Sequence, residues 1–152
     1  MSSETEICNL LYRYAELIDQ GRFEQIADEL FVHAHLIVGS EGTPTVDAAG
    51  MLEMFRNTTI RYEDGTPHTK HVISNPILQV DEEAGTATCR SYYTVFQQTA
   101  TLPLQPIVSG RYHDRFERVG GAWRFVERDY TKVDLIGDVS QHLRLSLRPA
   151  VS

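Results

Sequence analysis

The spacing of apolar residues divides the chain into a helical first part and a β-rich second part. Between residues 3 and 20, apolar side chains recur at three- and four-residue spacing until Gly21 ends the pattern. Ser3 and Glu6 form a capping box at the start of this segment. The pattern predicts an amphipathic first helix, with this apolar stripe: Ile7, Leu10, Leu11, Tyr14 and Ile18.

Two further helices and a short strand are expected before residue 63. A shorter helix follows Gly21, and its apolar stripe comprises Phe23, Ile26, Leu30 and Phe31. The Thr43-Pro44 start signal predicts another helix, from Val46 to about Tyr62. Residues 33–38 form a candidate strand between these two helices, closed by the turn residues 39–42.

From His68 onward the apolar period becomes two. Segments rich in Val, Ile, Thr, Tyr and Phe alternate with short loops, which predicts four long antiparallel strands: 68–80, 86–98, 106–118 and 122–134. Helices gathered first and strands gathered later indicate an α+β fold. We expect the three helices to cover the concave face of a curved, mostly antiparallel sheet, with a pocket at its mouth.

The chain length of 152 residues suits one domain, which we place at residues 1–134. Residues 135–152 carry Leu143, Leu145 and Leu147 without a clear period. We expect this tail to pack on the domain, where it would cover the pocket, or on a neighbouring subunit.

Charge and composition narrow the classes of partner. The formal net charge of -7, from 14 basic and 21 acidic residues, would repel phosphates, so we expect no nucleic acid partner. The first residues are polar and acidic, and no apolar run approaches the roughly 20 residues that span a bilayer. We therefore expect a cytoplasmic protein without membrane contact. Its two cysteines, Cys8 and Cys89, are interpreted as reduced core thiols.

The strongest candidate chemistry is a proton-transfer pair of Asp19 and His71. Asp19 ends the first predicted helix, where a carboxylate opposes the helix dipole, and His71 lies on a strand face that also carries Thr69, Ile73, Asn75 and Ile77. If the two side chains meet, Asp19 accepts the Nδ1 proton of His71, and Nε2 is free to remove a proton from carbon. The alternatives are a surface acid and a hydrogen-bonded core histidine.

Several other residues are candidates for substrate contacts. Tyr14 and one of Tyr92 or Tyr93 could donate hydrogen bonds to a developing negative charge, although wall packing is the alternative for each. We also assign Tyr93 and Asn75 to substrate binding. Arg128 either forms a salt bridge with Asp114 or Glu127, or binds an anionic group of the substrate.

Metal and cofactor chemistry lack a supporting motif. The six histidines include a His33-x-His35 pair, but His68 and His71 should point to opposite sides of a regular strand. The sequence has no Gly-rich phosphate loop, no Gly-x-Ser-x-Gly elbow and no Cys-x-x-Cys. We expect no metal site and no cofactor.

Three stretches of the sequence carry a resemblance to a known family. Residues 12–31 (YRYAELIDQGRFEQIADELF), 67–75 (PHTKHVISN) and 110–130 (GRYHDRFERVGGAWRFVERDY) resemble the SnoaL-like branch of the NTF2-like superfamily, and the resemblance extends over about residues 5–132. It implies an NTF2-like cone. The chain looks most like scytalone dehydratase, hexachlorocyclohexane dehydrochlorinase and bile-acid 7α-dehydratase, whose Asp-His pair matches Asp19 and His71.

The resemblance also suggests further roles. Tyr14 matches a tyrosine of the bile-acid enzyme, and Arg128 matches its arginine more loosely. Scytalone dehydratase has a second catalytic histidine on the next strand, where this chain offers only Tyr92, Tyr93, Phe96 and Gln97.

The resemblance implies a cofactor-free lyase or isomerase acting on a small, apolar, cyclic substrate, with dehydration as the first expectation. Polyketide cyclisation or steroid-type isomerisation is the alternative reaction. A different class is also open, namely a non-catalytic binder of hydrophobic ligands or an accessory subunit like the β subunit of ring-hydroxylating dioxygenases. We further expect a homo-oligomer, dimer or trimer, formed through the outer side of strands 86–118.

Overall fold

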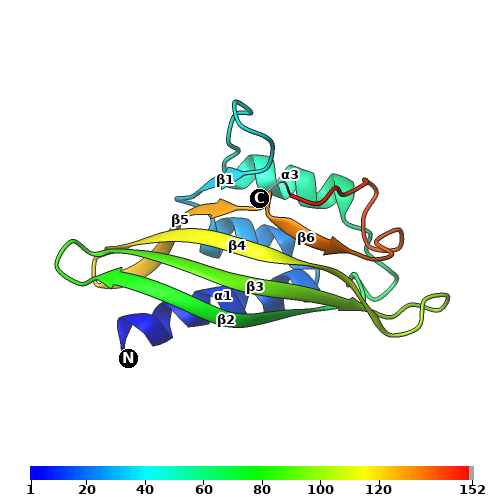
Figure 1. Ribbon diagram of the computed structural model, residues 1–152, viewed down its shortest axis with the longest axis horizontal. Coiled ribbons are helices and arrows are strands. Elements are labelled where there is room, and N and C mark those ends of the chain that lie inside the picture. Colours follow the sequence, from blue (N-terminus) through cyan, green and yellow to red (C-terminus); the bar gives the residue numbers. More distant parts are fainter. Residues whose placement is uncertain (151–152) are drawn as a thin grey trace.

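The computed structural model describes residues 1–150 (Figure 1). Its helical segments are α1 (Ser3–Asp19), α2 (Phe23–Gln25), which continues into the π-helical turn η1 (Ile26–Leu30), and α3 (Ala48–Thr58). Its strands are β1 (His35–Ile37), β2 (Thr69–Asp81), β3 (Thr86–Gln97), β4 (Gln105–Val119), β5 (Ala122–Asp129) and β6 (Val133–Ile136).

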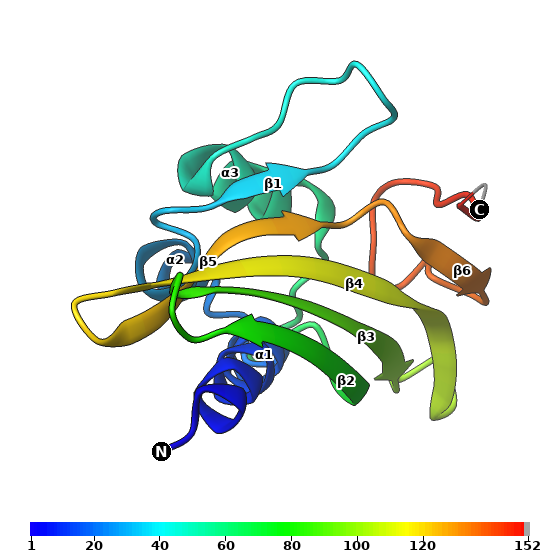
Figure 2. The same cartoon turned by 60° about the vertical axis from the view of Figure 1, so that its left-hand side comes forward.

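The strands form one curved sheet in the order β1-β5-β4-β3-β2, and β6 pairs with β4 (Figure 2). All neighbouring pairs are antiparallel except β1 and β5. The helix α1 packs along one face of this sheet, mainly against β2. The predicted α+β class, with helices on a curved, mostly antiparallel sheet, is confirmed.

Helix caps place the helix starts one to two residues away from the predicted positions. The hydroxyl of Ser2, not that of Ser3, accepts the N–H of Thr5 at the start of α1. The carboxylate of Asp47 accepts the N–H of Gly50 and starts α3 after the expected Thr43-Pro44 signal. This helix ends at Thr58, several residues before the predicted end at Tyr62.

The core forms between the apolar stripe of α1 and the inner face of the sheet. Ile7, Leu11 and Leu17 have no exposed surface, and Phe116 and Phe125 on β4 and β5 are at most 2 % exposed. Burial of such side chains stabilises a fold by about 1.5–3 kcal/mol each. The packing of α1 onto the sheet therefore fixes where its last residue, Asp19, meets β2.

The strand β2 contains an irregularity that the period-2 pattern does not predict. Asn75 has a φ of +40°, and the pairing of β2 with β3 shifts between Ser74 and Ile77. Beyond this bulge, Ile77 is 47 % exposed, whereas Leu78 packs against the core. The prediction that one face carries both His71 and Ile77 is therefore wrong, because the bulge exchanges the two faces.

The last predicted strand, 122–134, is two strands. β5 ends at Asp129. The chain then forms β6, which pairs with β4 and places Ile136 opposite Val108. The expected domain boundary at residue 134 falls inside β6. From there the described chain continues to Ala150, whose N–H donates to the carbonyl of Val133. The expectation for the tail also covers residues 151–152, which lie outside the described residues.

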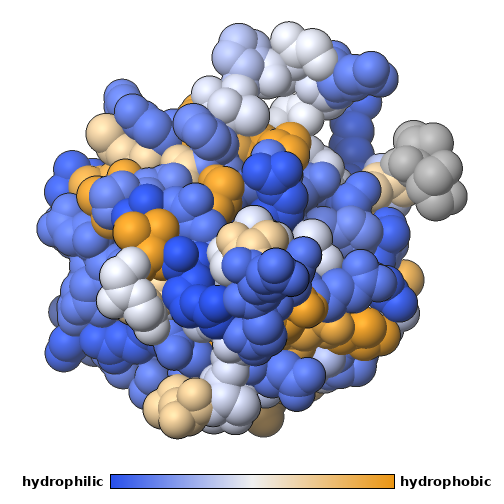
Figure 3. Space-filling model, turned by 90° about the vertical axis from the view of Figure 1, so that its left-hand side faces the viewer, coloured by the Kyte–Doolittle hydropathy of each residue, from blue (hydrophilic) through white to orange (hydrophobic). Residues whose placement is uncertain are grey.

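Figure 3 shows one end of the molecule, where hydrophilic residues predominate and hydrophobic residues form several separate groups. Within residues 1–150, no helix has the length and apolar character needed to cross a membrane.

Candidate active site

Asp19 and His71 form a hydrogen-bonded pair. Nδ1 of His71 lies 2.6 Å from Oδ1 of Asp19, and the two side chains are only 6 % (His71) and 10 % (Asp19) exposed. Because an ionised carboxylate only accepts hydrogen bonds, this geometry assigns the proton of the neutral imidazole to Nδ1. Nε2 then carries a free lone pair.

The carboxylate of Asp19 is held by two further donors from β2. Its Oδ2 accepts the backbone N–H of His71 at 2.8 Å, and its Oδ1 accepts the hydroxyl of Thr69 at 2.9 Å. With the imidazole, three donors from β2 bind one carboxylate at the end of α1. The end of α1 and the start of β2 therefore hold the two side chains in a fixed orientation, as proton transfer requires.

His71 lines a cavity with a volume of about 950 Å³. Its wall comes from α1, α3, the inner faces of β3 and β4, and the C-terminal tail. Within the described residues, the charged side chains that line it are all basic: Arg111, Lys132 and Arg148. Most of the remaining wall is apolar, and it includes Ile18, Met54, Phe55, Val95, Val108, Leu143, Leu145 and Leu147. Such a wall suits a mainly apolar ligand that is neutral or anionic.

Three tyrosines of the cavity wall lie close to the pair or to one another. Tyr14 is 2 % exposed, and its ring stands edge-on to His71 with centroids 6.3 Å apart. Tyr93 stacks on Tyr112 at 4.4 Å. Burial raises the pKa of Tyr14 well above its ordinary value and that of Tyr93 to about 12. Both hydroxyls therefore stay protonated near neutral pH and can donate hydrogen bonds.

Arg128 is fully buried and does not reach the cavity surface. It donates two hydrogen bonds to Asp114, at 2.8 and 3.0 Å, and both side chains are 0 % exposed. Its guanidinium also lies 3.7 Å from the ring centroid of Tyr112 and 4.5 Å from that of Tyr14. Arg128 is not among the residues that line the cavity. The geometry thus shows the salt bridge with Asp114 and gives no support to the assignment of Arg128 to substrate binding.

Asn75 also lies outside the cavity. It is exposed at the bulge of β2, where its left-handed backbone turns the strand. The assignment of Asn75 to substrate binding is corrected for this reason: the bulge removes it from the face that carries His71. Tyr93, by contrast, lines the cavity as the assignment requires.

The histidines considered for a metal site do not gather. Nε2 of His68 lies 3.1 Å from Oδ2 of Asp64, and its ring stacks on Tyr62. In residues 1–150, no group of three or more His, Cys, Asp or Glu side chains is arranged to hold a metal ion.

One cavity residue, His142, was missed from the sequence. It is 6 % exposed, and its ring centroid lies 6.2 Å from that of His71. Burial and the nearby His71 lower the pKa of His142 to about 3, against a weaker opposing effect of Asp19, so that it is neutral near neutral pH. A single histidine in a tail without periodicity gave no signal for this position.

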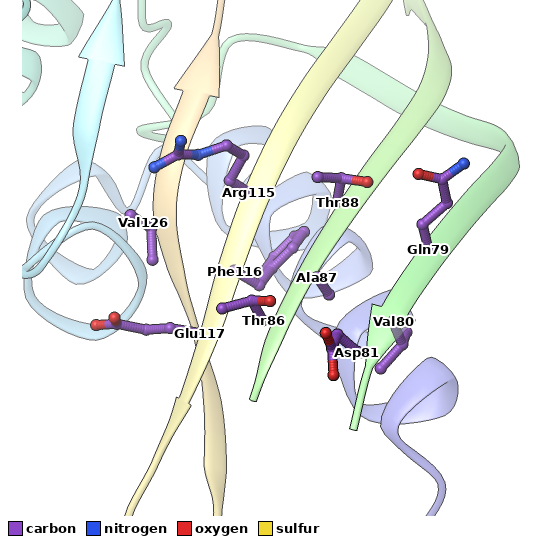
Figure 4. A pocket seen from close by; sticks show the side chains of 10 residues that line it. All are labelled: Gln79, Val80, Asp81, Thr86, Ala87, Thr88, Arg115, Phe116, Glu117 and Val126. Carbon is purple, nitrogen blue, oxygen red and sulfur yellow. The ribbon is translucent and has the colours of Figure 1, made fainter. Parts of the chain in front are cut away.

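Another hollow lies on the sheet alone. It has a volume of about 530 Å³ and is lined by residues of β2, β3, β4 and β5, including Thr88, Arg115 and Glu117 (Figure 4). Its lining has no histidine and no cysteine. We therefore place the candidate site in the larger cavity, at the Asp19-His71 pair.

Comparison with known proteins identifies the fold family. A model of the SnoaL-like domain matches residues 1–129. No curated protein matches the chain. A solved NTF2-like protein with a cystatin-like fold, from Novosphingobium aromaticivorans, is 21% identical with a TM-score of 0.65, over 83% of this chain and 79% of that one.

Two other similar structures come from the same bacterium. The β subunit of a candidate aromatic-ring-hydroxylating dioxygenase is 20% identical with a TM-score of 0.66, over 91% of this chain and 94% of that chain. A candidate scytalone dehydratase is 19% identical with a TM-score of 0.63, over 85% of this chain and 83% of that chain. At these identities the similarity shows a shared fold. The fold-level resemblance read from the sequence is confirmed.

Proposed function

The chain belongs to the SnoaL-like domain family, and we propose that it is a lyase or isomerase that uses its own Asp-His pair without a cofactor. Dehydration of a small, mainly apolar cyclic molecule is the reaction that we put first. One observation carries the proposal: His71, hydrogen-bonded to Asp19, lines a cavity of about 950 Å³. A fold alone would not support an activity, because related folds carry different functions.

The pair is arranged for proton removal from carbon. With Nδ1 bound to Asp19, Nε2 of His71 is the free base, and the carboxylate stabilises the imidazolium that forms. The electron pair of the broken C–H bond forms a double bond, and the leaving group departs from the neighbouring carbon. General base catalysis of this kind contributes about 10²- to 10⁴-fold to a rate.

Tyr14 is the candidate donor for the charge that develops on the substrate. Tyr14 belongs to the cavity wall beside His71, and burial keeps its hydroxyl protonated. A donor placed on a developing oxyanion contributes about 2.7–4 kcal/mol to catalysis. Tyr93 lies on the same wall and can take a similar part.

The proposal is tested with a simple substrate of the right chemistry. β-Hydroxycyclohexanone loses water to give a conjugated enone, which is followed by its ultraviolet absorbance. Exchange of the α-hydrogens of the ketone in D₂O, followed by NMR, reports proton removal even if water loss is slow. We expect both signals with the wild-type protein and their loss in His71→Gln.

The matched control is His33→Gln, because His33 is exposed and lies outside the cavity. It should behave like the wild-type protein. Equal exchange rates in His71→Gln and the wild-type protein would overturn the proposal.

Isomerisation and cyclisation use the same base and remain the alternative reactions. A non-catalytic role is the second candidate, favoured by the fold shared with the β subunit of a candidate dioxygenase. Under that alternative the protein would co-purify with a large, iron-containing partner, and the pair would hold a ligand without transforming it. Isolation of the protein from its native source, followed by iron analysis of the eluate, separates the two functions.

We also propose that the protein forms a homo-oligomer, a dimer or a trimer, through the outer side of β3 and β4. Exposed apolar side chains on or next to this face support it, since Val72, Ile77 and Tyr92 are 47 %, 47 % and 54 % exposed. Light scattering after gel filtration tests this, and a monomer at micromolar concentration would contradict it.

A further inference from the structure

We infer that His142, on the C-terminal tail, is a ligand-binding residue that hydrogen-bonds an oxygen substituent of the molecule held at His71. The inference rests on the proposed function in one respect only, that both place the ligand in the same cavity. It narrows the ligand class to cyclic, mainly apolar molecules that bear a hydroxyl or carbonyl oxygen.

The imidazole of His142 is an unsatisfied polar group in the cavity wall. It is 6 % exposed, and within residues 1–150 its Nδ1 has no hydrogen-bond partner. Buried polar atoms in native proteins are nearly always paired, so each exception requires an explanation. Because Nδ1 itself lies beneath the wall, a ligand oxygen in the cavity would meet the other ring nitrogen, Nε2, which makes no hydrogen bond within residues 1–150.

The position of His142 is fixed by its backbone. Its carbonyl accepts the N–H of Ile60 at 2.8 Å, and the next two residues pair with the end of α3: Leu143 bridges to Thr59, and the N–H of Arg144 donates to Thr58. The side chain amide of Gln97, at the end of β3, also donates to the carbonyl of Gln141 at 3.0 Å. This part of the tail is therefore held by contacts with the end of α3 and with β3. These contacts fix the position of the His142 ring in the cavity wall.

The two imidazoles present complementary functions to one ligand. Their centroids are 6.2 Å apart and their planes are 70° to each other, so both border the same part of the cavity. Because His142 is neutral, one of its nitrogens donates a hydrogen bond and the other accepts one. In a dehydration, it would hold the leaving oxygen while His71 removes the proton from the adjacent carbon. The proton taken by His71 then returns to that oxygen, water departs, and both imidazoles end neutral.

The test is a pair of unreactive ligands that differ only in one hydroxyl group, β-naphthol and naphthalene. Their dissociation constants are measured by NMR titration, and the Cε1 protons of His71 and His142 report where they bind. In the wild-type protein we expect β-naphthol to bind about tenfold more tightly than naphthalene, which corresponds to one hydrogen bond. We expect β-naphthol to shift the signal of His142.

Two variants separate the hydrogen bond from the shape of the ring. His142→Phe keeps a ring but has no polar atom, so it should bind both ligands equally. His142→Gln keeps a donor and an acceptor, so it should retain part of the preference for β-naphthol. The control His33→Gln should match the wild-type protein, since His33 is exposed outside the cavity.

The result is decided by the wild-type protein even if a variant does not fold. Binding of neither ligand, equal binding of both, or an unchanged signal of His142 in the presence of β-naphthol would overturn the inference. Retention of the full preference in a folded His142→Phe would overturn it as well. Because no reaction takes place, these outcomes are independent of whether His71 removes a proton from β-hydroxycyclohexanone.

Discussion

Asp114 and Asp19 each pair with a basic residue, and the two pairs lie in different surroundings. Asp114 binds Arg128 with both side chains fully buried and aromatic rings around the guanidinium. Asp19 binds His71 at the edge of a cavity, where the two side chains keep 10 % and 6 % of their surface exposed. We call the Asp114–Arg128 pair the closed pair, because neither side chain is exposed. The Asp19–His71 pair, the cavity pair, has a ring nitrogen available to a ligand.

The partner determines what each carboxylate can do. Burial opposes the charge of Arg128, but its carboxylate partner outweighs this and raises its pKa well above the ordinary value. Arg128 therefore cannot exchange its proton near neutral pH, and its pair with Asp114 can only support the structure. An imidazole can gain and lose a proton in this range, so the pair at the cavity is the one fitted for chemistry. Burial of a charge pair alone thus does not identify an active site.

Removal of the carboxylate from the cavity pair should have the largest effect on activity. Asp19→Asn keeps the size of the side chain, but it no longer requires Nδ1 of His71 to carry the proton. We expect the rate of α-hydrogen exchange in β-hydroxycyclohexanone to fall by about 10²-fold or more. Measured rates within a factor of about 3 of the wild-type value would show that the pair is not the base.

Removal of the carboxylate from the closed pair should have the largest effect on stability. Asp114→Asn leaves the guanidinium of Arg128 buried without its counter-charge. We expect the free energy of unfolding, measured with urea, to fall by about 3–5 kcal/mol. A loss below about 1 kcal/mol would mean that the pair adds little beyond an exposed ion pair.

The histidine of the tail should make stability depend on pH. The pKa of His142 is about 3 when folded and about 6.5 when unfolded, so between these values the unfolded chain binds the additional proton. Stability is therefore complete above about pH 6.5 and falls as the pH decreases towards 3, by at most about 1.4 kcal/mol per pH unit.

The measurement compares urea unfolding of the wild-type protein and His142→Phe at about pH 7 and about pH 5. The wild-type protein should lose more stability than the variant between the two conditions. Identical losses would show that His142 is not held neutral in the folded state.

The smallest effect on stability is expected for an exposed ion pair. Arg111 donates two hydrogen bonds to Asp134, each at 2.9 Å, in the same two-bond arrangement as the closed pair, but the side chains are 29 % and 38 % exposed. Asp134→Asn should cost less than about 1 kcal/mol of stability in the same urea experiment. A cost similar to that of Asp114→Asn would mean that burial is not what distinguishes the pairs.

The sequence predicted those features that periodicity and helix signals encode. The stripe of α1 and the alternation in β2 to β5 gave the α+β class, and the resemblance pointed to Asp19 and His71, which the structure places in contact. The face of Asn75 was assigned wrongly because β2 contains a bulge at this residue, whose backbone is left-handed. An alternating apolar pattern carries no signal of such a bulge.

Tertiary contacts explain the remaining differences. The tail shows no apolar period in its sequence. Its course is fixed instead by hydrogen bonds to the end of α3 and to Val133. No pattern within residues 135–150 could therefore place His142 beside His71. Arg128 left two interpretations open, and the register of β4 with β5, which sets Asp114 opposite Arg128, decided between them.

The tautomer of His71 tests the central claim most directly. Long-range ¹H–¹⁵N spectra of the wild-type protein near neutral pH distinguish a protonated from an unprotonated ring nitrogen. The account predicts a protonated Nδ1 and an unprotonated Nε2 in the wild-type protein, and a gain of the Nε2-protonated form in Asp19→Asn. A proton on Nε2 of wild-type His71 would contradict it, because no free base would then face the cavity.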